Sequence, residues 1–162
     1  MKFYMKREND KYLECFSVLD VFGNRKYKVI GKNFRIGKKF FLIDSSQTSL
    51  AFIRKLIFPF ISNYLIKSNI KEINLFENRL HKNPSYNIGG IDWIFKNSSQ
   101  PYVFSVTDKD SQIIMKQVRI FKNFCNNYEI EIINEKFEIV CLCISVCVNN
   151  LILNDNKICE LT

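Results

Sequence analysis

The segment "FEIVCLCISVCVNNLIL", residues 137–153, is the most informative part of the sequence for the architecture. Ten consecutive residues in it, Ile139 to Val148, carry neither a charge nor an amide. This run is too short to span a bilayer, which takes about 20 apolar residues. As a helix it is apolar on nearly every side, which is typical of a helix buried all round. A strand is the alternative, because Val, Ile and Cys are poor helix formers, but the length and the Asn149-Asn150 pair favour a helix over 138–153.

The same stretch raises the question of a metal site, because Cys141, Cys143 and Cys147 lie close together. On a helix Cys143 and Cys147 share one face, while Cys141 points roughly the opposite way. A structural zinc ion takes four ligands, and the other candidates are spread along the chain: Cys15, Cys125, Cys159 and the single histidine, His81. We therefore expect free thiols that fill space as small apolar groups, with no metal and no other cofactor. Such thiols, without an export signal at the start of the chain, predict a reducing, cytoplasmic location.

Before this stretch the chain is built of β-strands. Short runs rich in Ile, Val, Phe and Tyr alternate with polar pairs, a pattern typical of half-buried strands. Twelve strands are predicted, near residues 3–6, 14–21, 26–32, 38–44, 49–57, 62–68, 71–77, 84–90, 92–97, 102–108, 112–121 and 127–134. A meander of so many short strands indicates a barrel or a sandwich, and the spacing does not distinguish the two.

Two segments of the chain repeat each other. "FFLIDSSQTSLAFIRKLIFPFISNYLI" (40–66) aligns without a gap with "FSVTDKDSQIIMKQVRIFKNFCNNYEI" (104–130). Asp44 and Asp108 hold the same place in the two copies, each in a turn where its side chain caps backbone amides. The repeat predicts a pseudo-symmetric fold of two related halves. Closing such a sheet into a barrel would remove its exposed edges.

The charge of the chain is uneven. The net charge is +8, but residues 1–82 hold 17 Lys and Arg against 7 Asp and Glu, a net charge of +10, and the remainder carries −2. A basic surface favours anionic partners such as phospholipid head groups or nucleic acid, while the alternative is a set of solvated lysines on exposed strands. The candidate anion-binding or lipid-binding residues cluster around one predicted hairpin and the next long strand: Arg35, Lys38, Lys39, Arg54 and Lys55.

Four segments follow one another in a distinctive order: "MKFYMK" (1–6), "FSVLDVFGNRKYKVIGKNFRIGKKFFLID" (16–44), "AFIRKLIFPFISNYLI" (51–66) and "YEIEIINEKFEIVCLCISVCVNNLI" (128–152). In this order they resemble the LURP-one-related proteins, which share a superfamily with tubby C-terminal domains and phospholipid scramblases. The resemblance implies a mainly-β fold, a closed antiparallel β-barrel of about twelve strands wrapped around a central hydrophobic C-terminal helix. It implies one tubby-like domain, residues 1–155, and a polar tail at 156–162. In the helix, Cys and Ser take the small positions that Ala often holds in similar bacterial proteins.

No catalytic constellation is visible in the sequence. It has one histidine and lacks both a Gly-x-Ser-x-Gly motif and a phosphate-binding glycine loop, so we expect no catalytic residues and no enzyme. The basic half, together with the resemblance to tubby domains, which bind phosphoinositides, predicts a non-enzymatic binding module. Its partner would be an anionic phospholipid head group or a membrane-linked molecule.

Other functions stay open on the sequence alone. One is a nucleic-acid-binding or transcription-linked role, and another is a purely protein-binding module of the stress or defence type. A scramblase activity would need calcium ligands, and no acidic loop of the EF-hand type is present. We expect a cytoplasmic monomer without a transmembrane segment, associated with membranes only peripherally.

Overall fold

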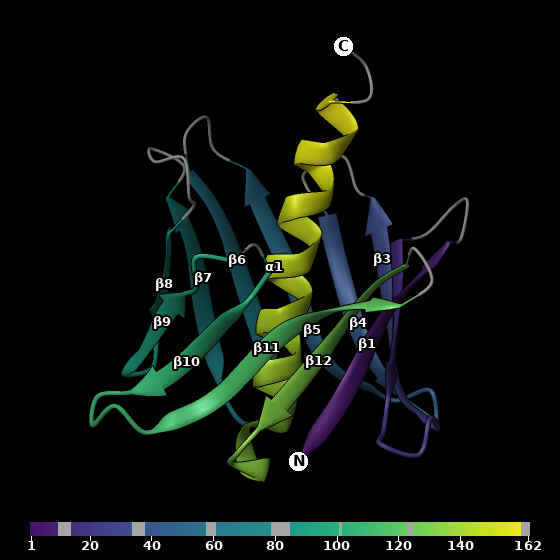
Figure 1. The fold of residues 1–162 in the computed structure, drawn as a ribbon, viewed down its shortest axis with the longest axis horizontal. Coiled ribbons are helices and arrows are strands. Elements are labelled where there is room, and N and C mark those ends of the chain that lie inside the picture. Colours follow the sequence, from purple (N-terminus) through teal and green to yellow (C-terminus); the bar gives the residue numbers. More distant parts are fainter. Residues whose placement is uncertain are drawn as a thin grey trace.

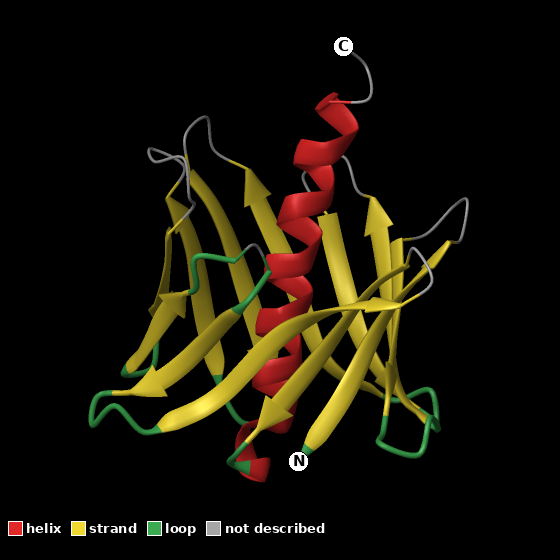
Figure 2. Ribbon diagram, viewed as in Figure 1, coloured by secondary structure: helices red, strands yellow, loops and turns green. Residues whose placement is uncertain are grey.

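The computed structural model describes the chain except for residues 10–13, 34–37, 58–60, 79–84, 101, 123–124 and 160–162. The described part contains twelve strands followed by a short 3-10 helix and a long α-helix (Figures 1 and 2). The strands are β1 (Lys2–Asn9), β2 (Glu14–Leu19), β3 (Arg25–Asn33), β4 (Lys38–Asp44), β5 (Ser49–Ile57), β6 (Ile61–Ser68), β7 (Glu72–Asn78), β8 (Ser85–Gly89), β9 (Trp93–Asn97), β10 (Phe104–Asp108), β11 (Ile113–Lys122) and β12 (Cys125–Ile132). The helices are η1 (Glu135–Phe137) and α1 (Glu138–Cys159).

The strands form one antiparallel sheet that curves into a nearly closed barrel (Figure 2). Their order across the sheet is β8-β7-β6-β5-β4-β3-β2-β1-β12-β11-β10-β9. Every hydrogen-bonded pair joins strands that are consecutive in the chain, except that β1 pairs with β12. Beside this pair the terminal amine of Met1 donates to Ile132 O at 2.7 Å. The predicted choice between barrel and sandwich is thus decided in favour of the barrel.

Aromatic side chains cover the seam between the two edge strands, β8 and β9. The ring centroids of Tyr86 on β8 and Phe95 on β9 lie 4.8 Å apart, and Phe95 stacks on Phe104 of β10 at 4.6 Å. The connection turns at Gly90, whose φ of 90° suits glycine and where a Cβ would lie 2.8 Å from Glu72 O. Within the described strands this seam is closed by side chains and not by a backbone ladder.

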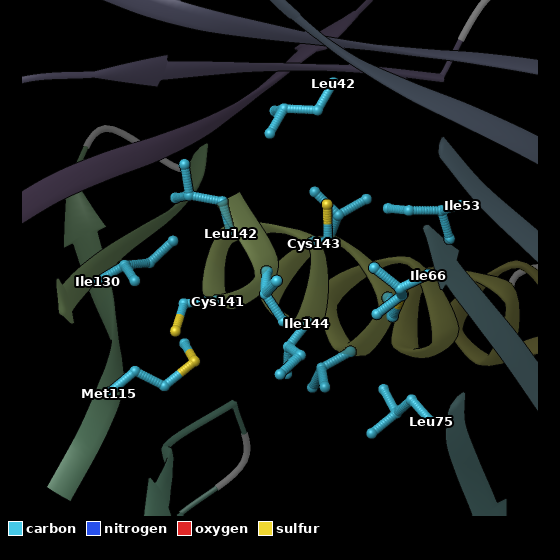
Figure 3. Packing of buried hydrophobic residues seen from close by; sticks show 14 of the residues in the cluster. Leu42, Ile53, Ile66, Leu75, Met115, Ile130, Cys141, Leu142, Cys143 and Ile144 are labelled. Atoms are coloured by element: carbon cyan, nitrogen blue, oxygen red, sulfur yellow. The ribbon is translucent and has the colours of Figure 1, made fainter. Parts of the chain in front are cut away.

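Helix α1 lies inside the barrel (Figure 1). Residues 140–149 are each at most 3% exposed, so the helix is buried on every side. Figure 3 shows Cys141 on the side toward Met115 of β11 and Cys143 on the side toward Ile53 of β5. The prediction of a buried helix is confirmed, and the strand alternative is wrong. The apolar interior offers no partner for a strand's backbone, whereas a helix satisfies its own backbone hydrogen bonds.

The start of α1 is fixed by polar contacts at the barrel end. Glu138 accepts hydrogen bonds from the hydroxyl of Tyr27 and from Lys26 Nζ, the latter at 3.0 Å. Burial, and then the hydrogen bond to Glu138, raise the pKa of Tyr27 well above its ordinary value. The helix ends at Cys159, beyond the predicted end at 153. Asn149, which the sequence placed near the end of the helix, lies inside the barrel, where its side chain accepts a hydrogen bond from Gln117 Nε2 at 2.8 Å.

The predicted repeat is confirmed by the strand registers. Aligning residues 40–66 with residues 104–130 maps β4, β5 and β6 onto β10, β11 and β12, so that the pair Lys55–Tyr64 corresponds to the pair Arg119–Tyr128. The register shifts also correspond, since they follow Leu42 in one copy and Val106 in the other. The predicted turn role of the aspartates holds in both copies: Asp44 Oδ1 accepts from Thr48 N at 2.8 Å, and Asp108 Oδ1 accepts from Gln112 N at 2.9 Å.

Candidate anion-binding face of the barrel

The wall of the barrel separates the charged residues that were predicted to act together. Along β5 the residues alternate between the interior, where Ile53 and Lys55 lie, and the outer surface, where Phe52 and Arg54 lie. Lys55 is only 4% exposed, and its Nζ is 5.5 Å from the ring centroid of Tyr64. Lys55 therefore belongs to the interior and cannot contact a surface partner in this arrangement.

Three cations form a row across the outer surface, which we call the cationic row: Lys32 on β3, Lys39 on β4 and Arg54 on β5. The strand registers place Lys32 opposite Lys39 and Lys39 opposite Arg54. Side chains directly opposite each other in antiparallel strands are about 5 Å apart at Cβ, so the three positive charges are close neighbours. Lys32 is exposed, while Lys39 and Arg54 are half-buried, and Arg54 Nε is a buried atom without a hydrogen-bond partner.

Aromatic residues lie next to the cationic row on the same face. The ring centroids of Phe41 on β4 and Phe52 on β5 are 5.5 Å apart, and Lys39 Nζ is 5.7 Å from the Phe52 centroid. Both rings are half-buried, so each still presents part of its surface to the outside. Among the described outward residues of β3 to β5 none is acidic. This face thus combines positive charge with apolar surface.

The five predicted residues are distributed unequally over this geometry. Lys39 and Arg54 are brought together in the cationic row, whereas Lys55 lies inside the barrel. Lys38 is half-buried on the side of β4 that also carries the buried Phe40, so it is not part of the outer row. Arg35 lies outside the described residues. The alternation of strand faces thus separates Lys38 and Lys55 from Lys39 and Arg54.

Lys32 was missed by the sequence analysis although a signal for it existed. In the register of β3 and β4, Lys32 is the cross-strand partner of Lys39. Residues directly opposite each other in an antiparallel pair lie on one face, so predicting this register would have placed both lysines there.

A second outer patch carries lysines but is compensated by an acid. Lys96 on β9 and Lys116 on β11 both pair with Ser105 of β10 and line a hollow of about 230 Å³. On its other side Lys116 lies opposite Glu131 of β12. The carboxylate beside this patch makes it a weaker anion site than the cationic row.

The cysteines of α1 are buried and chemically quiet. Cys141, Cys143 and Cys147 are free thiols, and burial raises the pKa of Cys141 to about 12 and the pKa values of the other two well above the ordinary range. Thiols that stay protonated are poor nucleophiles and poor metal ligands. In the described part of the chain no group of His, Cys, Asp and Glu side chains could hold a metal ion. Nor does that part contain a helix with the length and apolarity to cross a bilayer.

Comparison with known proteins agrees with this architecture. The uncharacterized protein YxjI of Bacillus subtilis is 20% identical over 156 residues, which cover 96% of each chain. The X-ray structure of a protein from Arabidopsis thaliana matches with a TM-score of 0.57 at 16% identity, covering 93% of this chain and 91% of that one; this match shows a common fold. The model of the LURP-one-related family matches residues 1–149. The chain, a nearly closed barrel around its own C-terminal helix, therefore belongs to the LURP-one-related family.

Proposed function

We propose that the protein is a non-enzymatic binding module whose cationic row attaches it peripherally to an anionic membrane surface. The observation that carries this proposal is the placement of Lys32, Lys39 and Arg54 in one register row on a face without described carboxylates. Of the five predicted binding residues, Lys39 and Arg54 belong to this row, and Lys32 is added to them.

Charge and apolar surface would act together in such binding. Each basic residue near an anionic leaflet contributes about 1 kcal/mol of attraction. Phe41 and Phe52 lie beside the row, with their rings partly exposed, and apolar side chains in such a place bury themselves at the boundary between head groups and acyl chains. The tubby-like fold also supports the proposal, since the resemblance noted above is to domains that bind phosphoinositides.

Sedimentation with lipid vesicles tests the proposal. We expect the protein to sediment with phosphatidylcholine vesicles that contain phosphatidylserine, but not with phosphatidylcholine alone, and to be released by salt. The double variant Lys39→Gln/Arg54→Gln should bind roughly 10- to 30-fold more weakly, because two basic contacts are lost. The matched control is Lys96→Gln/Lys116→Gln, which removes the same charge from the compensated patch and should bind like the wild type.

Three outcomes would contradict the proposal. Absence of sedimentation at low salt is one. Equal losses in the two double variants would be the second, because they would reveal attraction by net charge alone. The third is that the protein does not sediment with the vesicles but binds double-stranded DNA, and that this binding depends on Lys39 and Arg54. That result would assign the cationic row to nucleic acid.

A further inference from the structure

The two halves of the barrel carry corresponding cation–tyrosine pairs on their inner surfaces. Lys55 and Tyr64 face each other across β5 and β6. Arg119 and Tyr128 face each other across β11 and β12, at the equivalent positions of the second copy of the repeat. In each half the cation rests on an aromatic ring: Lys55 Nζ is 5.5 Å from the Tyr64 centroid, and Arg119 Cζ is 4.6 Å from the Tyr102 centroid.

The next strand around the barrel breaks this correspondence. In the first half Leu75 pairs with Tyr64, and Glu77, two residues further along β7, is 3% exposed on the same inner face. In the second half Met5 pairs with Tyr128, and Arg7, two residues further along β1, is half-buried on the same inner face. An arginine therefore stands where the symmetry of the fold places a glutamate. The corresponding inner charges are one lysine and one glutamate in the first half, but two arginines in the second.

The tyrosine of the second half also lacks a hydrogen-bond partner. Tyr128 is 1% exposed, and its hydroxyl is one of the buried polar atoms without a partner, whereas Tyr64 is not in this group. Burial raises the pKa of Tyr128 to about 12, and the charges of Arg119 and Arg7 act in the opposite direction. The registers give Tyr128 an arginine on each neighbouring strand, Arg119 directly opposite on β11 and Arg7 two residues beyond its partner Met5 on β1.

We propose that the second half of the barrel binds a small free oxyanion, a phosphate or a carboxylate, between Arg7 and the hydroxyl of Tyr128. A guanidinium presents paired donors that match such oxygens, and a tyrosine hydroxyl supplies a further donor. A small anion would compensate the half-buried charge of Arg7, and the described inward side chains of β1, β11 and β12 include no carboxylate. Arg119 faces Tyr128 across β11 and β12.

The position of the site distinguishes it from the cationic row. Tyr128 lies inside the barrel wall, out of reach of a head group that remains anchored in a bilayer. Arg7 is half-buried, which leaves an approach for a small ion. Just beyond it the interior is closed by the hydrogen bonds of Gln117 with Asn149 and with Tyr102 O, at 2.8 and 3.2 Å. The ligand is therefore a small ion in solution, and its binding should be independent of membranes.

Titration with inorganic phosphate and with acetate, followed by calorimetry and by the thermal unfolding midpoint, tests the proposal. We expect at least one of the two anions to bind saturably to the wild-type protein and to raise the midpoint as occupancy rises. Arg7→Gln should weaken binding by about tenfold or more, because a charged hydrogen bond is lost. Tyr128→Phe should weaken it by several-fold, and without anion this variant should be as stable as the wild type, since only an unpartnered hydroxyl is removed.

Two control variants test whether the loss of anion binding is specific to Arg7 and Tyr128. Tyr64→Phe makes the same change in the first half and should leave anion binding unaltered. Lys116→Gln removes an exposed charge from the outer wall and should have no effect either. Absence of saturable binding of both anions would overturn the proposal, as would losses in Tyr64→Phe or Lys116→Gln equal to those in Tyr128→Phe and Arg7→Gln. Loss of vesicle sedimentation in Tyr128→Phe would overturn the assignment to a free ion.

Discussion

Arg54 and Lys55 are neighbours in the sequence but face opposite sides of the barrel wall. Arg54 belongs to the outer cationic row, whereas Lys55 is 4% exposed and lies against Tyr64. A charge on the outer face is solvated and available to a partner. A charge on the inner face must be accommodated by the fold itself, because burial without compensation is expensive. A basic residue thus bears on function when it lies on the outer face of the barrel wall, and on stability when it lies on the inner face.

The largest difference between the faces should appear when a carboxylate is introduced. Ile144 is 0% exposed on α1, whereas Ile94 on β9 is 48% exposed. We expect Ile144→Asp to abolish folding, because an unpaired charge in the interior costs about 5 kcal/mol or more. Ile94→Asp should change the unfolding free energy by about 1 kcal/mol or less. Circular dichroism and urea unfolding of the purified variants measure both; a stably folded Ile144→Asp protein would show that α1 does not fill the barrel.

The next largest effect should be a loss of stability at alkaline pH, caused by the buried thiols of α1. Burial raises the pKa of Cys141 to about 12 and those of Cys143 and Cys147 well above the unfolded value of 9.0. The folded state therefore holds these protons more tightly than the unfolded state. Their stabilising effect is complete below pH 9 and is lost as the pH rises toward the folded pKa values, by about 1.4 kcal/mol per pH unit for each thiol.

Urea unfolding of the wild-type protein and of Cys143→Ala between pH 9 and 11 measures this effect. The variant has one buried thiol fewer, so its stability should fall less steeply by about 1.4 kcal/mol per pH unit. Identical slopes would indicate that the thiol of Cys143 titrates normally and is not enclosed.

The smallest effect concerns the adjacent pair itself. Lys55→Gln should destabilise the protein by about 1–3 kcal/mol, because its buried ammonium rests on Tyr64 and its neighbours are arranged around it. Arg54→Gln should change the unfolding free energy by about 0.5 kcal/mol or less, since a half-solvated charge contributes little. Chemical unfolding at one pH compares the two variants. Equal effects would remove the distinction between the faces at this position.

Much of the fold follows from local patterns in the sequence. The strand segments and the aspartate turns were readable because each depends on residues close together in the chain, and the repeat was readable because its two copies align without a gap. The buried helix was readable from its unbroken apolar run. The environment of Asn149 was not, because its partner is Gln117, which is 32 residues away and is brought near only by the barrel.

The candidate sites were less predictable than the fold. Strand alternation would have separated Lys55 from Arg54, but it cannot say which face of a strand is the inner one before the core is known. The contrast between Glu77 and Arg7 depends on the pairing of β1 with β12, which are the first and the last strands along the chain. No local sequence pattern predicts that strand pair.

The position of α1 at the end of the strand series determines when this protein can fold. The ribosome makes all twelve strands before it makes the helix. One edge of β1 has no partner strand until β12, the last strand, has been made. The inner face of the sheet has no apolar partner until residues 140–149 have emerged. Such surfaces are those on which nascent chains aggregate or are held by chaperones. Folding of the barrel can therefore be completed only once α1 has been made.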